Sequence, residues 1–278
     1  MKKQFILFTA LAMINVAVFA QNQDPTQSVC QGSTEIYYVD NTPGSTYNWT
    51  INPESGGTIL SGQGTYQISI QWTGPVGDYV VSVVETDVNS CDGEPKTVTV
   101  SVMSGPTPVI SGAATACTNT TEVYSVVGST SSTYTWSVSA EGTITGGQGT
   151  RSVTITWNSA GNATVSITES IGECSEEATY AVTVNPTPSP SIYGVASTCL
   201  NSTDVFTTPQ VAGNTYEWSV TTGNTIFAGQ GTNEVSITFG VIGNQTVTVA
   251  QTANGCTGID SKNVEVHPLP STSAIWHD

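Results

Sequence analysis

The sequence predicts an all-β protein of three tandem β-sandwich domains, set end to end as a rod. Residues 47–72, 134–157 and 216–239 repeat one pattern, which opens with Tyr-x-Trp, passes through Gly-Gln-Gly-Thr and closes on an aromatic residue. Apolar and polar residues alternate along each copy, which is typical of half-buried strands. The tryptophan follows the first cysteine of its copy by 19 residues each time. The copies therefore match by position, and the chain is a tandem array.

The first 20 residues have the pattern of a secretory signal. Two lysines precede an apolar run that ends in small residues at Val18 and Ala20. A membrane-spanning helix needs about 20 unbroken apolar residues, and Thr9 and Asn15 interrupt this run. We therefore expect residues 1–20 to be removed, and the mature chain to be exported and not itself membrane-spanning.

Two proline-rich spacers separate the repeats and set the domain boundaries. Proline at alternate positions in residues 105–108 and 185–190 favours extended, semi-rigid spacers. Turn residues recur every 8 to 12 positions, which predicts about seven strands per domain in two antiparallel sheets. The expected divisions are domain 1 at residues 21–104, domain 2 at 105–185, domain 3 at 186–267 and a tail at 268–278.

The Tyr-x-Trp segment is predicted to line the core of each domain. Its two rings are two residues apart, so they point to the same face of a strand. An exposed platform that stacks on sugars is the alternative, but the alternation places both rings on the apolar side. The tryptophan also stands between two cysteines, as does the core tryptophan that packs on a disulfide in immunoglobulin-like domains. The residues are Tyr47 and Trp49, Tyr134 and Trp136, and Tyr216 and Trp218.

The Gly-Gln-Gly-Thr segment at residues 62–65, 147–150 and 229–232 is predicted to be a tight turn. Two glycines around one residue supply the positive φ angles that a sharp reversal needs. A phosphate-binding loop would need a helix start behind it and usually a lysine. Neither follows any of the three copies, so we interpret the motif as structural.

Six cysteines in an exported chain indicate disulfides. Each repeat carries one pair at matched positions, which predicts one bridge inside each domain. No pair has the close spacing of a zinc site. Such a bridge would stabilise a small domain by roughly 4 kcal/mol. The predicted pairs are Cys30–Cys91, Cys117–Cys174 and Cys199–Cys256.

The chain is strongly acidic, with 5 basic and 21 acidic residues and a formal net charge of −16. Proteins that bind nucleic acid or anionic membranes need basic surfaces that release counterions. This balance excludes a nucleic-acid partner. Charged residues are only 9 % of the chain, fewer than a disordered acidic segment carries, and β-branched and aromatic residues are frequent. The chain is therefore folded.

The order of motifs resembles the PKD-like domains of surface proteins from Bacteroidota, over about residues 29–270. Domain 2 carries the pattern almost complete, in Tyr134-Thr135-Trp136-Ser137-Val138, Gly142-Thr143-Ile144 and Val153-Thr154-Ile155-Thr156-Trp157. The resemblance implies an extracellular array like those of gliding-motility adhesins and of proteins exported by the type IX secretion route. Cargo of that route ends in a sorting domain, whereas a short tail follows domain 3 here. A periplasmic or outer-membrane-associated subunit is therefore the competing expectation.

No catalytic residues are predicted, and we expect the protein not to be an enzyme. The two histidines, His267 and His277, lie at or beyond the end of domain 3. A nucleophile needs a base packed within hydrogen-bond reach, and no such pair recurs or clusters in the sequence. A cofactor is not expected.

One loop is a weak candidate for calcium. Residues 87–94 offer the oxygen ligands of Asp87, Asn89, Asp92 and Glu94 around a glycine. Their spacing is not that of an EF-hand loop. Domain 3 has none of these acids at the matching loop, so the repeat itself does not require a metal.

The tail at residues 268–278 resembles the opening of a further domain. Its prolines are followed by Ile275, Trp276 and His277, and an apolar pair at a free terminus is a poor choice for solubility. A frayed end is one interpretation. The other is that this segment adds as a strand to a sheet edge of a protein partner.

The function that these features favour is a non-enzymatic spacer and protein-interaction module at the cell envelope. The candidate partners are an outer-membrane β-barrel and a secretion or gliding complex. The alternative is a carbohydrate-binding adhesin, which exposed rings such as Tyr38 and Tyr66 suggest.

Overall fold

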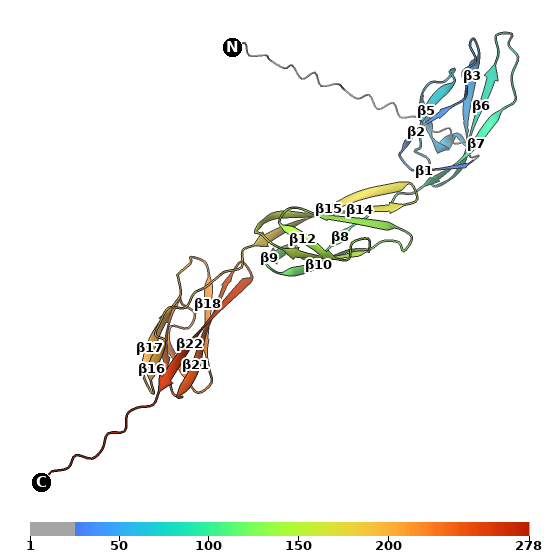
Figure 1. Cartoon of the computed structure of the whole chain (residues 1–278). Helices are drawn as coiled ribbons and strands as arrows, with labels where there is room; N and C mark the ends of the chain where they lie inside the picture. The colour runs from blue at the N-terminus through green and yellow to red at the C-terminus, as the bar shows by residue number, and fades with distance from the viewer. Residues whose placement is uncertain (1–25, 278) are drawn as a thin grey trace, which may run out of the picture. The chain divides into compact units, whose positions relative to one another are not determined.

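The computed structural model describes residues 26–277 (Figure 1). The predicted secretory signal at residues 1–20 lies outside the described residues. The chain divides into two compact units, Met1–Ser104 and Gly105–Asp278, which are described separately. The described residues form strands, and one short 3-10 turn, η1 (Glu54–Gly56), interrupts them. The all-β prediction is confirmed.

The first unit is a two-layer sandwich of seven strands. One sheet has the order β1-β7-β6-β3 and the other the order β2-β5-β4. Strand β1 pairs parallel with β7, and the remaining pairs are antiparallel. The strands are β1 (Thr26–Cys30), β2 (Thr34–Tyr38), β3 (Thr46–Asn52), β4 (Thr58–Ser61), β5 (Gln67–Gln71), β6 (Gly77–Thr86) and β7 (Lys96–Met103).

The second unit contains two sandwiches of the same design. In domain 2 the sheets have the orders β12-β13-β10-β8 and β11-β14-β15-β9. Its strands are β8 (Ile110–Ser111), β9 (Thr115–Cys117), β10 (Thr121–Val126), β11 (Thr133–Val138), β12 (Gly142–Gly146), β13 (Ser152–Trp157), β14 (Gly161–Ile171) and β15 (Cys174–Asn185).

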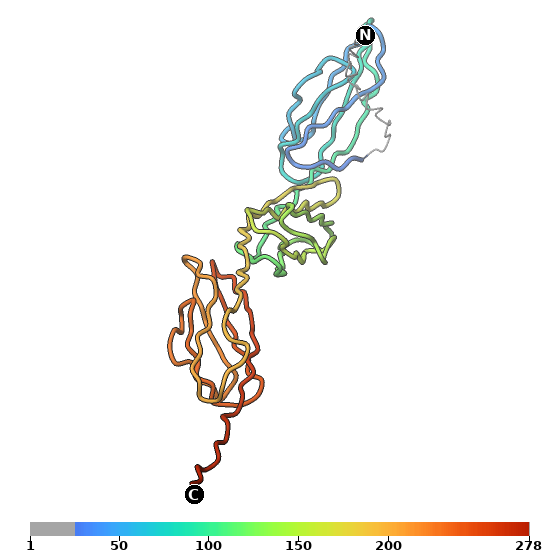
Figure 2. Tube along the Cα trace, turned by 60° about the vertical axis from the view of Figure 1, so that its left-hand side comes forward, coloured from blue at the N-terminus to red at the C-terminus, as the bar shows by residue number. Residues whose placement is uncertain are grey.

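Domain 3 repeats the arrangement with the sheets β16-β22-β21-β18 and β17-β20-β19 (Figures 1 and 2). Its strands are β16 (Ser197–Cys199), β17 (Thr203–Thr207), β18 (Thr215–Val220), β19 (Thr225–Ala228), β20 (Glu234–Thr238), β21 (Gly243–Ala253) and β22 (Cys256–His267). In each domain one short strand near the start, β1, β9 or β16, runs parallel to the last strand.

Each domain has its own hydrophobic core, made by the inward residues of the alternating strands. The Tyr-x-Trp rings lie in these cores, and Trp49, Trp136 and Trp218 are 4 %, 2 % and 1 % exposed. The prediction that they are core residues is confirmed. Burying one such ring removes about 150 to 250 Å² from water and contributes at most about 4 to 6 kcal/mol. The separate cores explain why the sequence repeats as whole units.

The Gly-Gln-Gly-Thr segments are turns, as predicted, but the glutamine has a role that the sequence did not reveal. In domain 2, Gln148 Oε1 accepts a hydrogen bond from Trp136 N at 2.8 Å, and Gln148 Nε2 donates to Trp136 O at 2.8 Å. Gln63 and Gln230 bond Trp49 and Trp218 in the same way. Since β11 is an edge strand, the side chain pairs backbone groups that would otherwise face water.

The flanking residues of the motif fix this arrangement. Gly147 has φ +82°, and a Cβ there would collide with the carbonyl oxygen of Ser152. Trp136 Nε1 donates a hydrogen bond to Thr150 O at 2.8 Å. The motif therefore holds the backbone of the core tryptophan through the glutamine and its indole through the threonine carbonyl.

Candidate functional site

The predicted disulfides are wrong. Cys117 is bonded to Cys256, with 5.6 Å between their Cα atoms, so a bridge joins domain 2 to domain 3. Cys91 and Cys199 are exposed free thiols. Cys30 and Cys174 are disulfide-bonded as well. The pairs Cys30–Cys91, Cys117–Cys174 and Cys199–Cys256 therefore do not form.

The strand register gives the physical reason. Cys117 ends β9 and lies opposite Asn185, the last residue of β15, whereas Cys174 is the first residue of β15. Eleven residues of extended strand separate the two ends by about 36 Å, and a disulfide needs Cα atoms within about 7 Å. The cysteines of one domain thus lie at opposite ends of it. Within the second unit the core tryptophans pack without a disulfide between the two sheets of their domain. In this they differ from the core tryptophan of immunoglobulin-like domains, which packs on such a disulfide.

The bridge belongs to a wider junction between domains 2 and 3. Asn185 Nδ2 donates a hydrogen bond to Asn254 O at 3.2 Å, in the turn between β21 and β22. The hairpin approaches the linker so closely that a Cβ at Gly258 would collide with Pro188 O. Figure 2 shows this hairpin reaching the linker. Close packing and the bridge restrict the movement of domain 3 against domain 2.

The linker is also held from the side of domain 2. Thr187 N donates to Thr118 Oγ1 at 2.9 Å, and Thr187 Oγ1 donates to Thr118 O at 2.7 Å. Further along, Ile192 N donates to Asp260 Oδ2 at 2.8 Å, and the Ile192 side chain is part of the core of domain 3. This spacer therefore has a defined path, with contacts to both of its neighbours.

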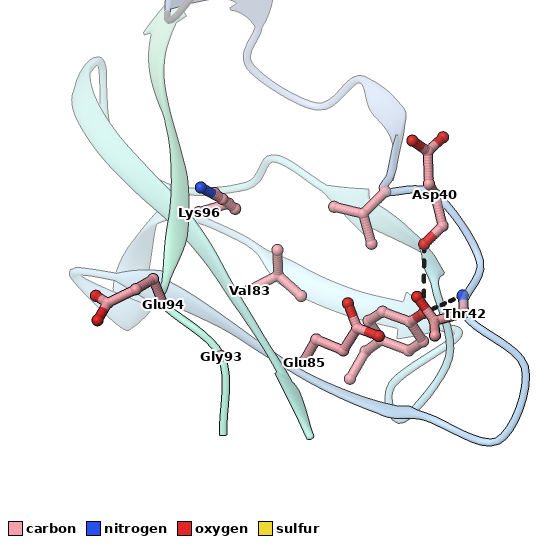
Figure 3. A pocket seen from close by; sticks show the side chains of 9 residues that line it. Asp40, Thr42, Val83, Glu85, Gly93, Glu94 and Lys96 are labelled. Carbon is pink, nitrogen blue, oxygen red and sulfur yellow. Dashed lines mark hydrogen bonds between the residues drawn. The ribbon is translucent and has the colours of Figure 1, made fainter. Parts of the chain in front are cut away.

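Domain 1 has a surface hollow of about 400 Å³ (Figure 3). Glu85 lies inside it beside Tyr47, whose hydroxyl accepts a hydrogen bond from Thr42 N at 2.8 Å and donates to Asp40 O at 3.3 Å. Hydroxyl groups from Ser45, Thr42 and Tyr47 lower the pKa of Glu85. The hollow is lined by Val39, Asp40, Thr42, Tyr47, Val83, Glu85, Gly93, Glu94 and Lys96.

A local irregularity in the sheet borders this hollow. Gly77 pairs with Val102 on β7, but Gly93 N donates to Glu85 O at 2.8 Å, a register that differs by one residue. The extra residue falls at Pro95, which has no N–H to give to the ladder. The proline directly before β7 was the sequence signal for this irregularity, and it was missed.

The residues that match Glu85 in the other two domains are buried. Glu169 in domain 2 is 3 % exposed and accepts a hydrogen bond from Tyr134 Oη at 3.3 Å. Gln251 in domain 3 is also buried. The hollow of domain 1 is lined by three carboxylates, a lysine and a tyrosine, but by no serine, cysteine or histidine, so its lining lacks the usual nucleophile and base pair.

The calcium candidate falls on the hairpin loop beside this hollow. Asp87 Oδ1 accepts hydrogen bonds from Asn89 N and Cys91 N, both at 2.8 Å. Asp92 Oδ1 accepts from Thr86 Oγ1 at 2.7 Å. These carboxylates thus shape their own loop. Among residues 26–277 no group of three or more histidines, cysteines or acids is arranged to hold a metal, and calcium binding through Asp87, Asn89, Asp92 and Glu94 stays a prediction.

The tail residues lie fully in solvent. Ile275 is 95 % exposed and Trp276 is 88 % exposed, and His277 is exposed beside them. His267, at the end of β22, is exposed too. Within the described part of the chain, no helix has the length and apolar character to cross a membrane.

The fold and the linkers define a tandem β-sandwich protein, and the comparison with known families identifies the kind of domain. A PKD-like domain model matches residues 16–102, 104–184 and 185–266. The chain belongs to the PKD-like domain family. Families of this kind are generally non-enzymatic, and their repeats are typical of extracellular adhesion or spacer modules. No curated protein sequence matches the chain.

Several solved immunoglobulin-domain structures are similar at low identity. Titin domains I67–I69 match at 10 % identity with a TM-score of 0.38, over 87 % of this chain and 95 % of that one. Drosophila OTK extracellular domains 3–5 match at 10 % identity with a TM-score of 0.33, over 87 % and 94 %. The mouse nectin-like molecule 4 ectodomain matches at 12 % identity with a TM-score of 0.30, over 90 % and 99 %. Similarity at this level carries no functional argument.

Proposed function

We propose that this protein is a non-enzymatic, exported spacer of the cell envelope that also binds other proteins. The observation that carries the proposal is the Cys117–Cys256 bridge between successive domains. A disulfide inside a domain would serve its stability, whereas a bridge across a boundary restricts how one domain moves on the next. Disulfides persist in oxidising compartments, which supports an exported location.

The contacts around the bridge support the same role. The linker forms hydrogen bonds with Thr118 on one side and Asn254 on the other, at 2.9 and 3.2 Å. In a flexible tether the backbone groups would form hydrogen bonds with water instead of with the neighbouring domains. The acidic, hydroxyl-rich surface supports solubility in such a compartment. In this proposal the assembly is an adhesion, secretion or gliding complex, and its outer-membrane component is the protein partner.

The spacer role is tested by small-angle X-ray scattering of the full mature chain and of a Cys117→Ser/Cys256→Ser variant. We expect both to be folded and the variant to scatter as a broader distribution of sizes. A conservative control, Ser175→Ala, alters an exposed residue near the opposite end of domain 2 and should leave the scattering unchanged. Identical curves for the variant and the natural protein would remove the stiffening role of the bridge.

Location and partner binding need the native envelope. Protease treatment of intact cells, followed by detection of the protein, separates the cell surface from the periplasm. Cross-linking and co-purification then identify the proteins that accompany it. Recovery of the protein from the cytoplasmic fraction would contradict the proposal.

A carbohydrate-binding adhesin is the second candidate, because two aromatic side chains are exposed at the same end of the β2–β5 strand pair in domain 1. Tyr38 and Tyr66 are 39 % and 40 % exposed, and Val39 N donates a hydrogen bond to Tyr66 O at 2.9 Å. Aromatic faces of this kind can stack on sugar rings. Binding on a glycan array that disappears with Tyr66→Ala would favour this candidate. An array without signal would remove this candidate and leave the spacer as the proposed function.

A further inference from the structure

The two free thiols occupy positions that form a bridge elsewhere in the same chain. Cys199 ends β16 and lies opposite His267, the last residue of β22. Cys117 ends β9 and lies opposite Asn185, the last residue of β15. Cys199 therefore occupies in domain 3 the position that the bonded Cys117 occupies in domain 2. The Cys199 side chain is exposed.

Cys91 matches the other half of the bridge. Cys256 is the first residue after the turn between β21 and β22 and pairs with Ala253. Cys91 directly follows the loop after β6, where Asp87 N donates to Cys91 O at 3.0 Å. It is also exposed. Domain 1 thus presents the hairpin thiol, and domain 3 presents the strand-end thiol.

A glycine marks the surface that receives the linker. Gly258, two residues after Cys256, is where the hairpin of domain 3 meets the carbonyl oxygen of Pro188. Gly93, two residues after Cys91, pairs with Glu85 as Gly258 pairs with Gln251. A Cβ at Gly93 would have one neighbour within 4 Å, Glu85 O at 3.4 Å. Domain 1 therefore has a vacant counterpart of the linker contact, although domain 2 has Glu176 at this position.

The tail supplies the matching linker. Residues 268–270 repeat the Pro-x-Pro of residues 186–188, directly after the last strand. In the earlier linker Ile192 enters the core of the next domain, and Tyr193 bridges to Thr207 on the edge of β17. In the tail, Ile275 lies one residue further on and is exposed. In residues 26–277, β2 of domain 1 pairs with β5 alone, so its other edge can take such a strand.

We propose that Cys199 of one molecule and Cys91 of a second copy form a disulfide that repeats the Cys117–Cys256 junction between molecules. Successive junctions join copies head to tail, with the tail of one copy along the first domain of the next. Thiol–disulfide exchange makes the bond: each thiol gives up a proton, and a small-molecule or protein disulfide takes two electrons and leaves as two thiols. The inference goes beyond the proposed function and does not depend on it.

The test uses the full mature chain, oxidised with glutathione disulfide at micromolar protein concentration and analysed by non-reducing electrophoresis and peptide mass mapping. We expect a ladder of covalent oligomers that collapses on reduction and yields one new linked peptide pair, Cys91 with Cys199. Cys91→Ser and Cys199→Ser variants should each remain monomeric. Mixed in equal amounts, they should give one dimer and no larger species.

Two further variants test whether the copies dock in the expected manner. Gly93→Val places a side chain where the linker carbonyl would lie, and we expect dimer formation in the mixed experiment to slow at least tenfold. Thr97→Val, an exposed position on the neighbouring strand β7, is the matched control and should leave the rate unchanged. Ile275→Ser/Trp276→Ser should slow the same step at least threefold.

Four results would overturn the proposal. One is a protein that stays monomeric with both thiols free after oxidation. Another is a monomer of unchanged size whose Cys91 and Cys199 are linked within one chain. The third is dimerisation of either single variant alone as fast as dimerisation of the mixture. The fourth is a rate of dimer formation that neither Gly93→Val nor the tail variant alters. The third and fourth results would each indicate random collision of exposed thiols.

Discussion

Replacing Gln148 with alanine tests the role assigned to the Gly-Gln-Gly-Thr glutamine. The substitution removes two hydrogen bonds, from Trp136 N and to Trp136 O, each 2.8 Å long. A neutral hydrogen bond contributes about 0.5 to 1.5 kcal/mol net. Water can replace part of the loss because the glutamine is exposed. We expect domain 2 to lose about 2 kcal/mol of unfolding free energy, which lowers its melting temperature by about 8 to 16 °C.

Native-state hydrogen exchange localises this effect. A loss of about 2 kcal/mol should speed exchange of the Trp136 amide by roughly 30-fold, whereas the Trp218 amide in domain 3 should exchange at its usual rate. Gln148→Glu keeps the acceptor for Trp136 N and loses the donor, so about half of the effect should remain. Asn162→Ala, at an exposed position on β14, is the control. If Trp136 exchanges within threefold of the natural protein in Gln148→Ala, the glutamine does not hold the strand edge.

Three other predictions concern the bridge and two titrating groups. Cys117→Ser/Cys256→Ser should keep the far-ultraviolet circular dichroism and buried tryptophan fluorescence, since neither core contains this disulfide; loss of either signal would contradict that. Burial raises the pKa of Tyr124 to about 12, so stability present below pH 10 should fall between pH 10 and 12, and Tyr124→Phe should flatten that part of a pH–stability curve. Hydrogen bonds lower the pKa of Glu85. Its contribution should therefore persist above the ordinary carboxyl pKa and be lost on acidification through the lowered value, and an NMR titration that finds an ordinary or raised pKa would refute this.

The sequence determined the fold class because the relevant information is local and repeated. Period-two alternation fixes which face of a strand is buried, and the three copies confirm each other. Trp49, Trp136 and Trp218 could therefore be placed in three cores before any coordinates. The turn at Gly147 could also be predicted, since two close glycines permit backbone angles that other residues avoid.

The roles inside the turn needed the folded chain. Gln148 is polar and exposed, and alternation says nothing about its partner. Its bonds to Trp136 depend on β11 being at the edge of a sheet, which is a property of strand order. The hollow beside Glu85 likewise borders a one-residue change of register between β6 and β7 near Pro95, and the pairing of two strands is also a property of the folded chain.

The cysteines show most clearly what could not be predicted from the sequence. The sequence by itself determined that the cysteines recur as matched pairs in an exported array. Only the tertiary structure decided that Cys117 bonds Cys256, because strand direction puts the two cysteines of each domain at opposite ends. A disulfide depends on which Cα atoms approach within a few ångströms, and the cysteine that approaches Cys117 in this way belongs to the next domain.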